Sequence, residues 1–224
     1  MPTQFSQTIK EKIAILKRLD PNYKVFGANS HQYKFNQVVD LKDIVLFEKK
    51  YHCKLPESYK DFLVNVGNGG VGPSYGVFLL GKMDDGFNLS AWTDDFVAPH
   101  KPFPFKEAFN DTSMLEEGMP DEAEFDDIDD YETAYNKWSD EKMGQLQIEY
   151  WDLHALDGAI PIVEHGCACR SWLVVAEGIE YGYIWQDDTA DEGGVFPFES
   201  RNKERYTFDE WYLQWLENSI KIKN

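Results

Sequence analysis

The spacing of apolar residues predicts helices in the first third of the chain. One pattern runs over 5–16 and stops at Asp20, because Pro21 disfavours helical backbone in the residue before it. A second begins after Asp40, a good N-cap, and ends near Tyr51. The apolar positions are Phe5, Ile9, Ile13 and Leu16 in the first pattern, and Leu41, Ile44, Val45 and Phe47 in the second.

A third expected helix has the clearest limits. Pro56 suits the first helical position, and Glu57 complements the positive end of the helix dipole. Glycines between Gly67 and Gly72 then stop the helix, because they tolerate the positive φ of a helix C-cap and a tight turn. The side of this helix that faces the core carries Tyr59, Phe62, Leu63 and Val66.

Short runs of β-branched and aromatic residues bounded by glycines predict strands at 77–80, 160–163, 172–175 and 181–185. The link between the last two is short enough for a hairpin, and no crossover helix separates the later strands. The sheet is therefore expected to be antiparallel. Thr207 and Glu210 form a capping box before a final amphipathic helix that reaches Ile220.

These elements predict an α+β fold, an antiparallel sheet flanked by helices. Prolines interrupt the pattern after the first strand, and helical spacing returns only over 131–151. We therefore expect one domain over 1–224, with a helical N-terminal extension at 1–39. An acidic, partly helical insertion is expected at 82–158, between the first strand and the later strands.

Negative charge dominates the composition. The 224 residues hold 40 acidic and 22 basic side chains, a formal net charge of -18. Such a surface repels a phosphate backbone, so nucleic acid is not an expected ligand, whereas a basic protein would be attracted. A role in solubility alone accounts for the charge equally well. Twelve acids and no Lys, Arg or His lie between Glu107 and Glu132, so the charge is concentrated in the insertion.

The remaining composition indicates a folded protein in a reducing compartment. Apolar residues make up 42% and aromatic residues 15% of the chain, which is too much for global disorder. No signal peptide is visible in 1–24 and no apolar run is long enough to cross a membrane, so a cytoplasmic setting without membrane contact is expected. The three cysteines, Cys53, Cys167 and Cys169, do not suggest a disulfide framework.

Two stretches, within 40–81 and 158–220, closely resemble the SUKH superfamily, which includes the fungal regulators of cell-wall glucan synthesis. The first comprises Phe47-Glu48, Tyr51, Leu55-Pro56-Glu57-Ser58-Tyr59-Lys60-Asp61-Phe62-Leu63 and Asn68-Gly69-Gly70. The second comprises Ala159-Ile160-Pro161-Ile162, Gly166, Trp172-Leu173-Val174-Val175, Gly178, Gly182-Tyr183-Ile184-Trp185 and Thr207-Phe208-Asp209-Glu210-Trp211.

The resemblance implies a SUKH-like fold, with helices around an antiparallel sheet. For bacterial members it also implies an immunity role, in which the protein neutralises toxins of polymorphic or contact-dependent systems. It supplies no catalytic motif. The N-terminal helix and the acidic insertion make this chain longer than a minimal member, so the choice of partner does not carry over.

Three motifs suggest chemistry that their context disfavours. Gly72-Pro73-Ser74-Tyr75-Gly76 matches the hydrolase nucleophile pattern, but a helix precedes it and a strand follows, the reverse of the order that exposes such a serine. The acidic loop at 187–194 lacks the glycine and the glutamate of a calcium-binding EF-hand at the required positions. Neither motif predicts a catalytic or calcium site.

The third motif is a group of possible zinc ligands, Glu164, His165, Cys167 and Cys169. It forms one cluster, whereas a closed structural zinc site usually shows two separated ligand pairs. At strand spacing the two thiols would point to the same face, where they pack as small apolar groups. We therefore expect no metal, no other cofactor and no catalytic residue.

The stretch 121–132 is the most plausible binding element. Its three apolar residues recur at three-residue spacing, so one helical face could present apolar anchors rimmed by charge. The alternative is a solvated helix docked on its own domain. The candidate partner-binding residues are Asp121, Glu122, Glu124, Phe125, Asp126, Asp127, Ile128, Asp129 and Asp130, with Tyr131 on the same face, and Asp187, Asp188, Asp191 and Glu192 in a loop after a strand.

The sequence thus predicts a protein that binds another protein stoichiometrically. We expect an immunity protein that covers the active site of a cognate toxin, and a basic nuclease would suit the charge. A regulator or scaffold of cell-envelope synthesis or signalling is the alternative, and an enzyme is a third class. The oligomeric state is not indicated.

Overall fold

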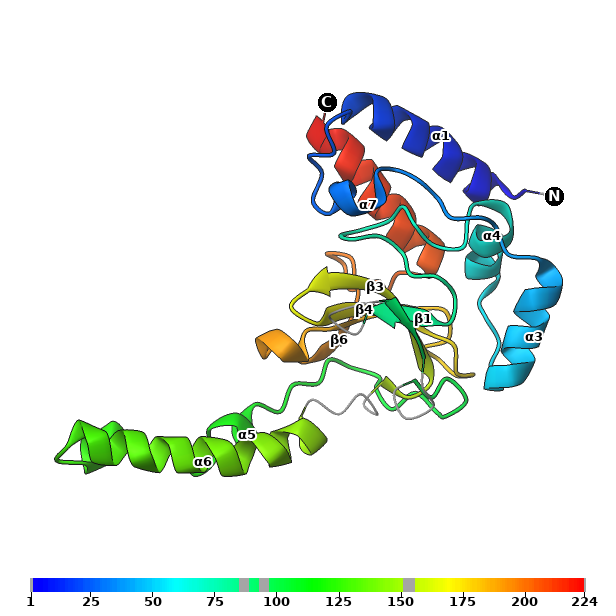
Figure 1. Cartoon of the computed structure of the whole chain (residues 1–224). Helices are drawn as coiled ribbons and strands as arrows, with labels where there is room; N and C mark the ends of the chain where they lie inside the picture. The colour runs from blue at the N-terminus through cyan, green and yellow to red at the C-terminus, as the bar shows by residue number, and fades with distance from the viewer. Residues whose placement is uncertain (1, 85–88, 93–96, 151–155, 224) are drawn as a thin grey trace.

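The centre of the molecule is a four-stranded antiparallel sheet in the order β3-β4-β5-β6 (Figure 1). A computed structural model describes residues 2–84, 89–92, 97–150 and 156–223. The expected α+β class and the antiparallel sheet are confirmed. The strands are β3 (Ala159–Gly166), β4 (Cys169–Val174), β5 (Ile184–Asp187) and β6 (Val195–Pro197).

The first expected strand is not a regular strand. At 77–80 the chain makes only isolated bridges, in which Val77 pairs with Gly70 and with Val163. Positive φ angles of 102° at Gly76 and 77° at Gly81 bend the backbone on either side, which leaves too few extended residues for a ladder. The first regular strands form instead a hairpin inside the expected insertion, β1 (Lys82–Asp84) and β2 (Leu89–Ala91).

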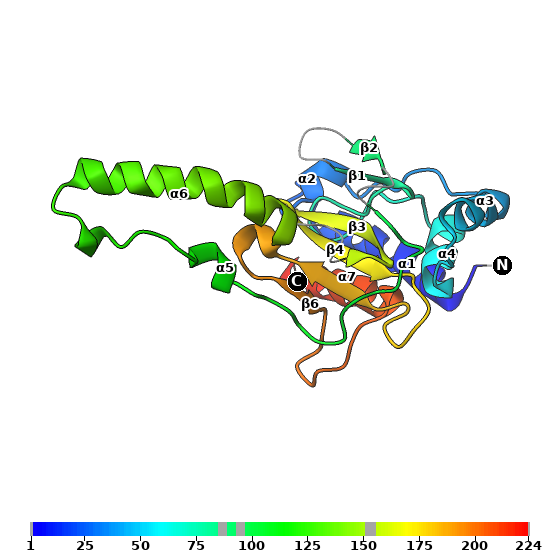
Figure 2. The ribbon, with the colours of Figure 1, turned by 90° about the horizontal axis from the view of Figure 1, so that it is seen from below.

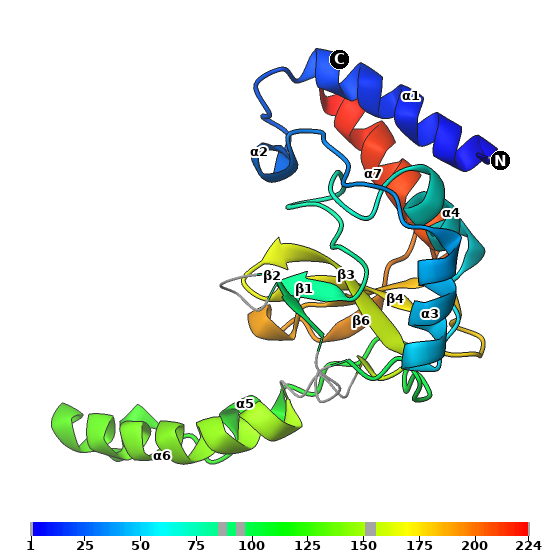
Figure 3. The same ribbon diagram turned by 45° about the vertical axis from the view of Figure 1, so that its right-hand side comes forward.

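Three helices lie together on one side of the sheet (Figures 1 and 3). In α1 the expected apolar positions Ile9, Ile13 and Leu16 are buried, and Lys12 pairs with Glu217 of α7 at 3.1 Å. The N-terminal extension therefore contributes to the core. The three helices are α1 (Gln4–Leu19), α4 (Glu57–Asn65) and α7 (Phe208–Lys223).

Aromatic rings join these helices to one another. Phe62 of α4 lies 5.3 Å, between ring centroids, from both Phe208 and Tyr212 of α7. Trp172 and Trp185 face each other across β4 and β5 and are also fully buried. Burial of side chains of this size contributes about 1.5–3 kcal/mol each, so the rings of Phe62, Phe208 and Tyr212 hold α4 and α7 together.

One half of the capping box expected before α7 is present, the return of the Glu210 carboxylate to Thr207. The Thr207 N–H donates to the Glu210 carboxylate at 2.9 Å, and the Thr207 hydroxyl donates to the same oxygen at 2.7 Å. The N-terminus of α7 is thus fixed by the residues that the sequence indicated.

The second expected helix, α3 (Leu41–Tyr51), is less buried than its pattern predicted. Ile44 is its buried residue, while Leu41 and Val45 are 62% and 55% exposed. Asp40 occupies the N-cap position, but its carboxylate pairs with Lys42 at 3.0 Å and does not cap a backbone N–H. The short helix α2 (Ala28–His31) precedes it and was not expected as a separate element.

The expectation that Cys167 and Cys169 share one face of a strand was wrong. Cys167 and Ala168 have φ angles of 51° and 65° and form the turn between β3 and β4. Cys167 is therefore exposed, whereas Cys169 begins β4 and is buried. No helix in the described ranges is long and apolar enough to span a membrane.

The buried carboxylate of Asp20 fixes the chain where α1 ends. Its oxygens accept hydrogen bonds from the Lys24 and Val25 N–H groups, both at 2.8 Å, and from the Tyr33 hydroxyl at 2.7 Å. Burial alone would raise the pKa of Asp20, but these hydrogen bonds and Lys223 lower it to about 2. Ionised Asp20 therefore stabilises the turn that leads to α2.

The folded pKa of Asp20 lies below its usual value of 3.8, so its contribution to stability is present above pH 4 and is lost as the pH falls toward 2. We expect Asp20→Asn to lower the free energy of unfolding by about 2 kcal/mol at pH 7. Urea unfolding of both proteins measures this difference. Titration of the Asp20 carboxyl carbon by NMR should give a midpoint near 2, and a midpoint near 4 would contradict the prediction.

Gly27 should be intolerant of any side chain. It has φ 75°, and a Cβ there would lie 1.8 Å from the Ser74 carbonyl oxygen. We expect Gly27→Ala to destabilise the protein by about 2 kcal/mol or more, through backbone strain and displacement of the loop at 72–76. Gly144→Ala is the matched control: it has open space around it inside a helix and should gain about 0.5–1 kcal/mol in thermal or urea unfolding.

Candidate functional site

A helical arm projects away from the sheet and from the layer of α1 and α7 (Figures 1 and 2). We call residues 111–150 the arm. It contains α5 (Ser113–Glu116), the 3-10 turn η1 (Glu122–Glu124) and α6 (Ile128–Glu149). At 22 residues α6 is about 33 Å long. The helical spacing over 131–151 thus predicted α6, which begins at Ile128, three residues before the pattern.

Contacts between its two halves give the arm its own structure. The Trp138 indole N–H donates to the Glu117 carbonyl oxygen at 2.9 Å, and Lys142 pairs with the Glu117 carboxylate at 2.9 Å. Gly118 lies against the Trp138 ring, which is within van der Waals distance of a Cβ placed there. The outgoing segment is thus fastened along α6.

The tip of the arm holds nine of the predicted binding residues, but they do not form one helix. The Asp127 carboxylate accepts the Asp129 N–H at 2.8 Å and starts α6 there, which leaves Phe125 in extended backbone before the helix. The Phe125 ring turns back onto Tyr131, with centroids 5.8 Å apart. The expected single face of Phe125, Ile128 and Tyr131 was therefore wrong.

Several acids at the tip also have a structural role. Asp121 accepts the Ala123 N–H at 2.9 Å at the start of η1, as Asp127 does at the start of α6. Asp129 and Asp130 lie in the first turn of α6, where negative charge favours the helix dipole. The other predicted acids at the tip, Glu122, Glu124 and Asp126, are exposed.

Exposed apolar side chains accompany this charge. Ile128 is 54%, Tyr135 38% and Met143 50% exposed. Their spacing of seven and eight residues places them along one side of α6. Tyr135 also contacts Tyr131 and Trp138, so the stripe borders the aromatic residues that hold the arm together. The sequence did not indicate that Tyr135 and Met143 are exposed, because the same helical spacing suits a helix that packs on the domain and one that projects from it.

The second predicted acidic group lies at the root of the arm. The Glu192 carbonyl oxygen accepts from the Asn110 amide at 2.8 Å, and the Tyr150 hydroxyl donates to Asn110 at 2.9 Å. The root and the tip are separated by the length of α6, so the structure does not bring the two acidic groups together. The four residues of this group are Asp187, Asp188, Asp191 and Glu192.

Only part of this second group is available to a partner. Asp187 is buried and accepts hydrogen bonds from the Thr189 N–H and hydroxyl, at 3.2 and 2.7 Å. Asp191 accepts a weak hydrogen bond from the Cys169 thiol. Burial, with Asp187 and Asp191 nearby, raises the pKa of Asp188. In the described ranges, no three His, Cys, Asp or Glu side chains are placed to hold a metal ion.

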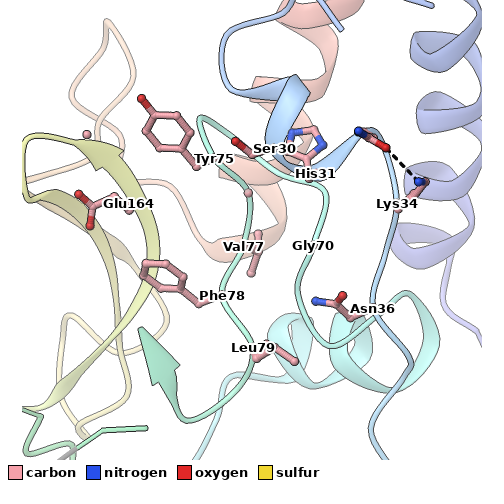
Figure 4. A pocket seen from close by; sticks show the side chains of 13 residues that line it. Ser30, His31, Lys34, Asn36, Gly70, Tyr75, Val77, Phe78, Leu79 and Glu164 are labelled. Atoms are coloured by element: carbon pink, nitrogen blue, oxygen red, sulfur yellow. Dashed lines mark hydrogen bonds between the residues drawn. The ribbon is translucent and has the colours of Figure 1, made fainter. Parts of the chain in front are cut away.

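A broad groove of about 810 Å³ lies over the irregular part of the sheet (Figure 4). Aromatic side chains of Tyr75 and Phe78 line it, together with charged Lys34 and Glu164. The Glu164 carboxylate pairs with Arg170 at 3.3 Å, and the Lys34 ammonium group donates to the neutral Gln32 amide at 2.9 Å. No periodic pattern marks this groove in the sequence.

Similarity to known proteins agrees with the fold. Residues 39–218 match the model of the SMI1 / KNR4 family (SUKH-1). Comparison with curated proteins and comparison with solved structures give no significant match. The matched range begins just before α3 and includes α4, the sheet, the arm and most of α7. Since it covers well over half of the 224 residues, the chain belongs to the SMI1 / KNR4 family (SUKH-1).

Proposed function

We propose that this protein is an immunity protein that neutralises a cognate toxin by stoichiometric binding, with the arm as its main contact. Membership of the SMI1 / KNR4 family (SUKH-1) is consistent with an immunity or regulator role. The arm supports the finer proposal, because it combines exposure, charge and apolar surface in a segment that projects from the domain (Figure 2).

The charge of the arm favours a basic partner. Fourteen of the 40 acidic side chains lie in the arm, at 111–150, together with two of the 22 basic ones. A projecting segment of one sign attracts an oppositely charged protein before contact and raises the association rate. The arm therefore supplies rapid encounter.

The apolar stripe supplies affinity after encounter. Ile128, Tyr135 and Met143 lie beside acidic residues on α6, as anchors surrounded by a polar rim. A helix that places such anchors at seven-residue spacing fits a groove on its partner. Binding in this way buries the stripe and leaves the acids at the edge of the interface.

Inhibition follows from occupation of a basic cleft. A nuclease binds phosphates with Lys and Arg side chains, and an acidic helix about 33 Å long presents carboxylates to the same groups. An arm seated in that cleft excludes nucleic acid without any catalytic step. A toxin of this kind would bind the protein one to one.

The second candidate function is that of a regulator or scaffold of cell-envelope synthesis or signalling, which the family also accommodates. The neighbouring gene distinguishes the two. A large secreted protein that ends in a toxin domain, encoded beside this chain, favours the immunity role, and coexpression of that domain with this chain should protect the host cell.

The charge at the tip can be tested with that toxin domain. The variant with Asp126, Asp127, Asp129 and Asp130 replaced by Asn keeps residues that can cap a helix, so α6 should remain folded. We expect its association rate to fall about tenfold or more at low salt, and the difference from wild type to shrink at high salt, where charges are screened. Surface plasmon resonance at several salt concentrations measures the association rates of the variant and of wild type.

A matched control removes four acids from elsewhere on the surface. Glu11, Asp43, Glu177 and Glu204 are all exposed and lie outside the arm. Their replacement by the corresponding amides should reduce the association rate much less than the tip variant does. If both variants slow association equally, net charge accounts for the effect and the arm has no special role.

The apolar stripe gives an independent test. Replacement of both Ile128 and Tyr135 by Ala should leave the association rate nearly unchanged and raise the dissociation rate about tenfold or more, at low and high salt alike. Circular dichroism should show that α6 is retained. Unchanged dissociation with a folded arm would exclude the stripe from the interface.

A further inference from the structure

A second cavity, of about 430 Å³, lies between α7 and the loop 72–76. That loop separates it from the groove of Figure 4: Tyr75 lines the groove, whereas Pro73 and Ser74 line the smaller cavity. Its walls include Phe198, Trp211 and Trp215, and a space of this volume with apolar walls has the size of a small-molecule site.

The backbone of Ser74 is held in a defined position at the floor of this cavity. Ser74 has φ 46°, a left-handed conformation that is uncommon for serine. Gly27 packs directly against its carbonyl group, and the Gly76 N–H donates to the Pro73 carbonyl oxygen at 2.9 Å. The backbone position from which the Ser74 side chain extends is therefore set by the fold.

The Ser74 hydroxyl ends a chain of hydrogen bonds that begins in the core and is partly buried near the cavity. Ser74 Oγ lies 2.7 Å from His165 Nδ1, and His165 Nε2 lies 2.6 Å from Ser171 Oγ. The Gln186 amide donates to Ser171 Oγ at 2.8 Å, and Ser171 is fully buried. Residues far apart in sequence thus form one polar line that opens at the cavity.

Two proton arrangements fit this line, and they differ in which ring nitrogen of His165 carries the proton. Ser171 Oγ accepts from Gln186 and can still either accept from or donate to His165 Nε2; we adopt donation, because it gives the buried hydroxyl proton an acceptor. Nδ1 then carries the ring proton and donates to Ser74 Oγ. This order leaves the Ser74 O–H free to donate to a ligand in the cavity.

Burial determines the charge of the His165 ring. Burial lowers the pKa of His165 from its usual value of 6.5, although a hydrogen bond with Gln186 opposes the shift. The imidazole is therefore neutral at neutral pH and carries one ring proton. With that proton on Nδ1, the ring cannot act as a base toward Ser74, which favours binding over acyl transfer.

The charge around the cavity differs from that of the whole chain. In a protein of net charge -18, the cavity lining contains two lysines, Lys24 and Lys223, and no acid. Lys223 pairs with Asp20 at 3.2 Å, while Lys24 is exposed at the rim. The nearest positive charge left for a ligand is therefore that of Lys24.

We propose that this cavity binds a small amphipathic monocarboxylate. The carboxylate accepts a hydrogen bond from the Ser74 hydroxyl and lies near the Lys24 ammonium group. An aliphatic or aromatic tail packs against Trp211 and Trp215. The site involves neither the arm nor a protein partner, so it is independent of the proposed immunity function.

The test compares two probes that share one tail, 4-phenylbutyrate and the neutral 4-phenylbutan-1-ol, by isothermal titration calorimetry. The acid should bind at least tenfold more tightly than the alcohol. Ser74→Ala should weaken the acid about tenfold and leave the alcohol unchanged, and Lys24→Ala, at an exposed position, should weaken the acid a few-fold. In NMR spectra the probes should shift the Trp211 and Trp215 indole N–H resonances.

The four-residue tip variant of the arm is the control and should bind 4-phenylbutyrate like wild type, whether or not the arm binds a toxin. Equal affinity for acid and alcohol in wild type, or no change in either variant, would overturn the proposal. So would the absence of indole shifts at millimolar probe. Hydrolysis of 4-nitrophenyl butyrate by wild type that is lost in Ser74→Ala would also overturn it. Such activity would mean that Ser74 donates to His165 Nδ1 and acts as a nucleophile.

Discussion

The packing of Phe62 against Phe208 and Tyr212 is the interaction on which the rest of this structure depends. It joins α4, near the start of the family match, to α7 near its end, with rings fully buried on both sides. The Tyr212 hydroxyl also donates to the Val71 carbonyl oxygen at 2.7 Å, which fixes the chain just before the loop 72–76. One aromatic cluster therefore closes the domain and positions the floor of the smaller cavity.

Closure of the domain by its two ends leaves the chain between them free to extend outward. Tyr150 at the end of the arm hydrogen bonds to Asn110, which directly precedes the arm, and the bridge between Phe109 and Val195 anchors this segment to β6. Negative charge and apolar surface can accumulate on the arm because they do not have to be accommodated in the core. The aromatic cluster contributes to the stability of the domain through burial, whereas the arm contributes little to that stability.

Local pattern predicted the elements that local forces determine. The apolar spacing of Ile9, Ile13 and Leu16 gave α1, and the β-branched and aromatic runs gave β3, β4 and an antiparallel sheet. The break at the arm tip was missed because Asp127 can either continue a helix or cap a new one, and the cap is formed. The turn at Cys167 was missed because non-glycine residues with positive φ leave no signal in the sequence.

The site at Ser74 could not be predicted from local sequence patterns, because it depends on a contact between distant residues. Ser74 and His165 are 91 positions apart, and only the closed core brings them together. The expected order of elements around Ser74 argued against a hydrolase nucleophile, but it gave no indication that a histidine would meet the same hydroxyl. The acidic binding residues, in contrast, could be proposed from composition, since charge density needs no tertiary contact to be recognised.

The joined root of the arm has a consequence for how this protein can change over time. Because Asn110 and Tyr150 are hydrogen bonded to each other, the two ends of the arm are neighbours, and the segment between them can be lengthened, shortened or exchanged without altering the gap that the domain must span. The sequence of the arm can thus vary separately from that of the residues that close the core.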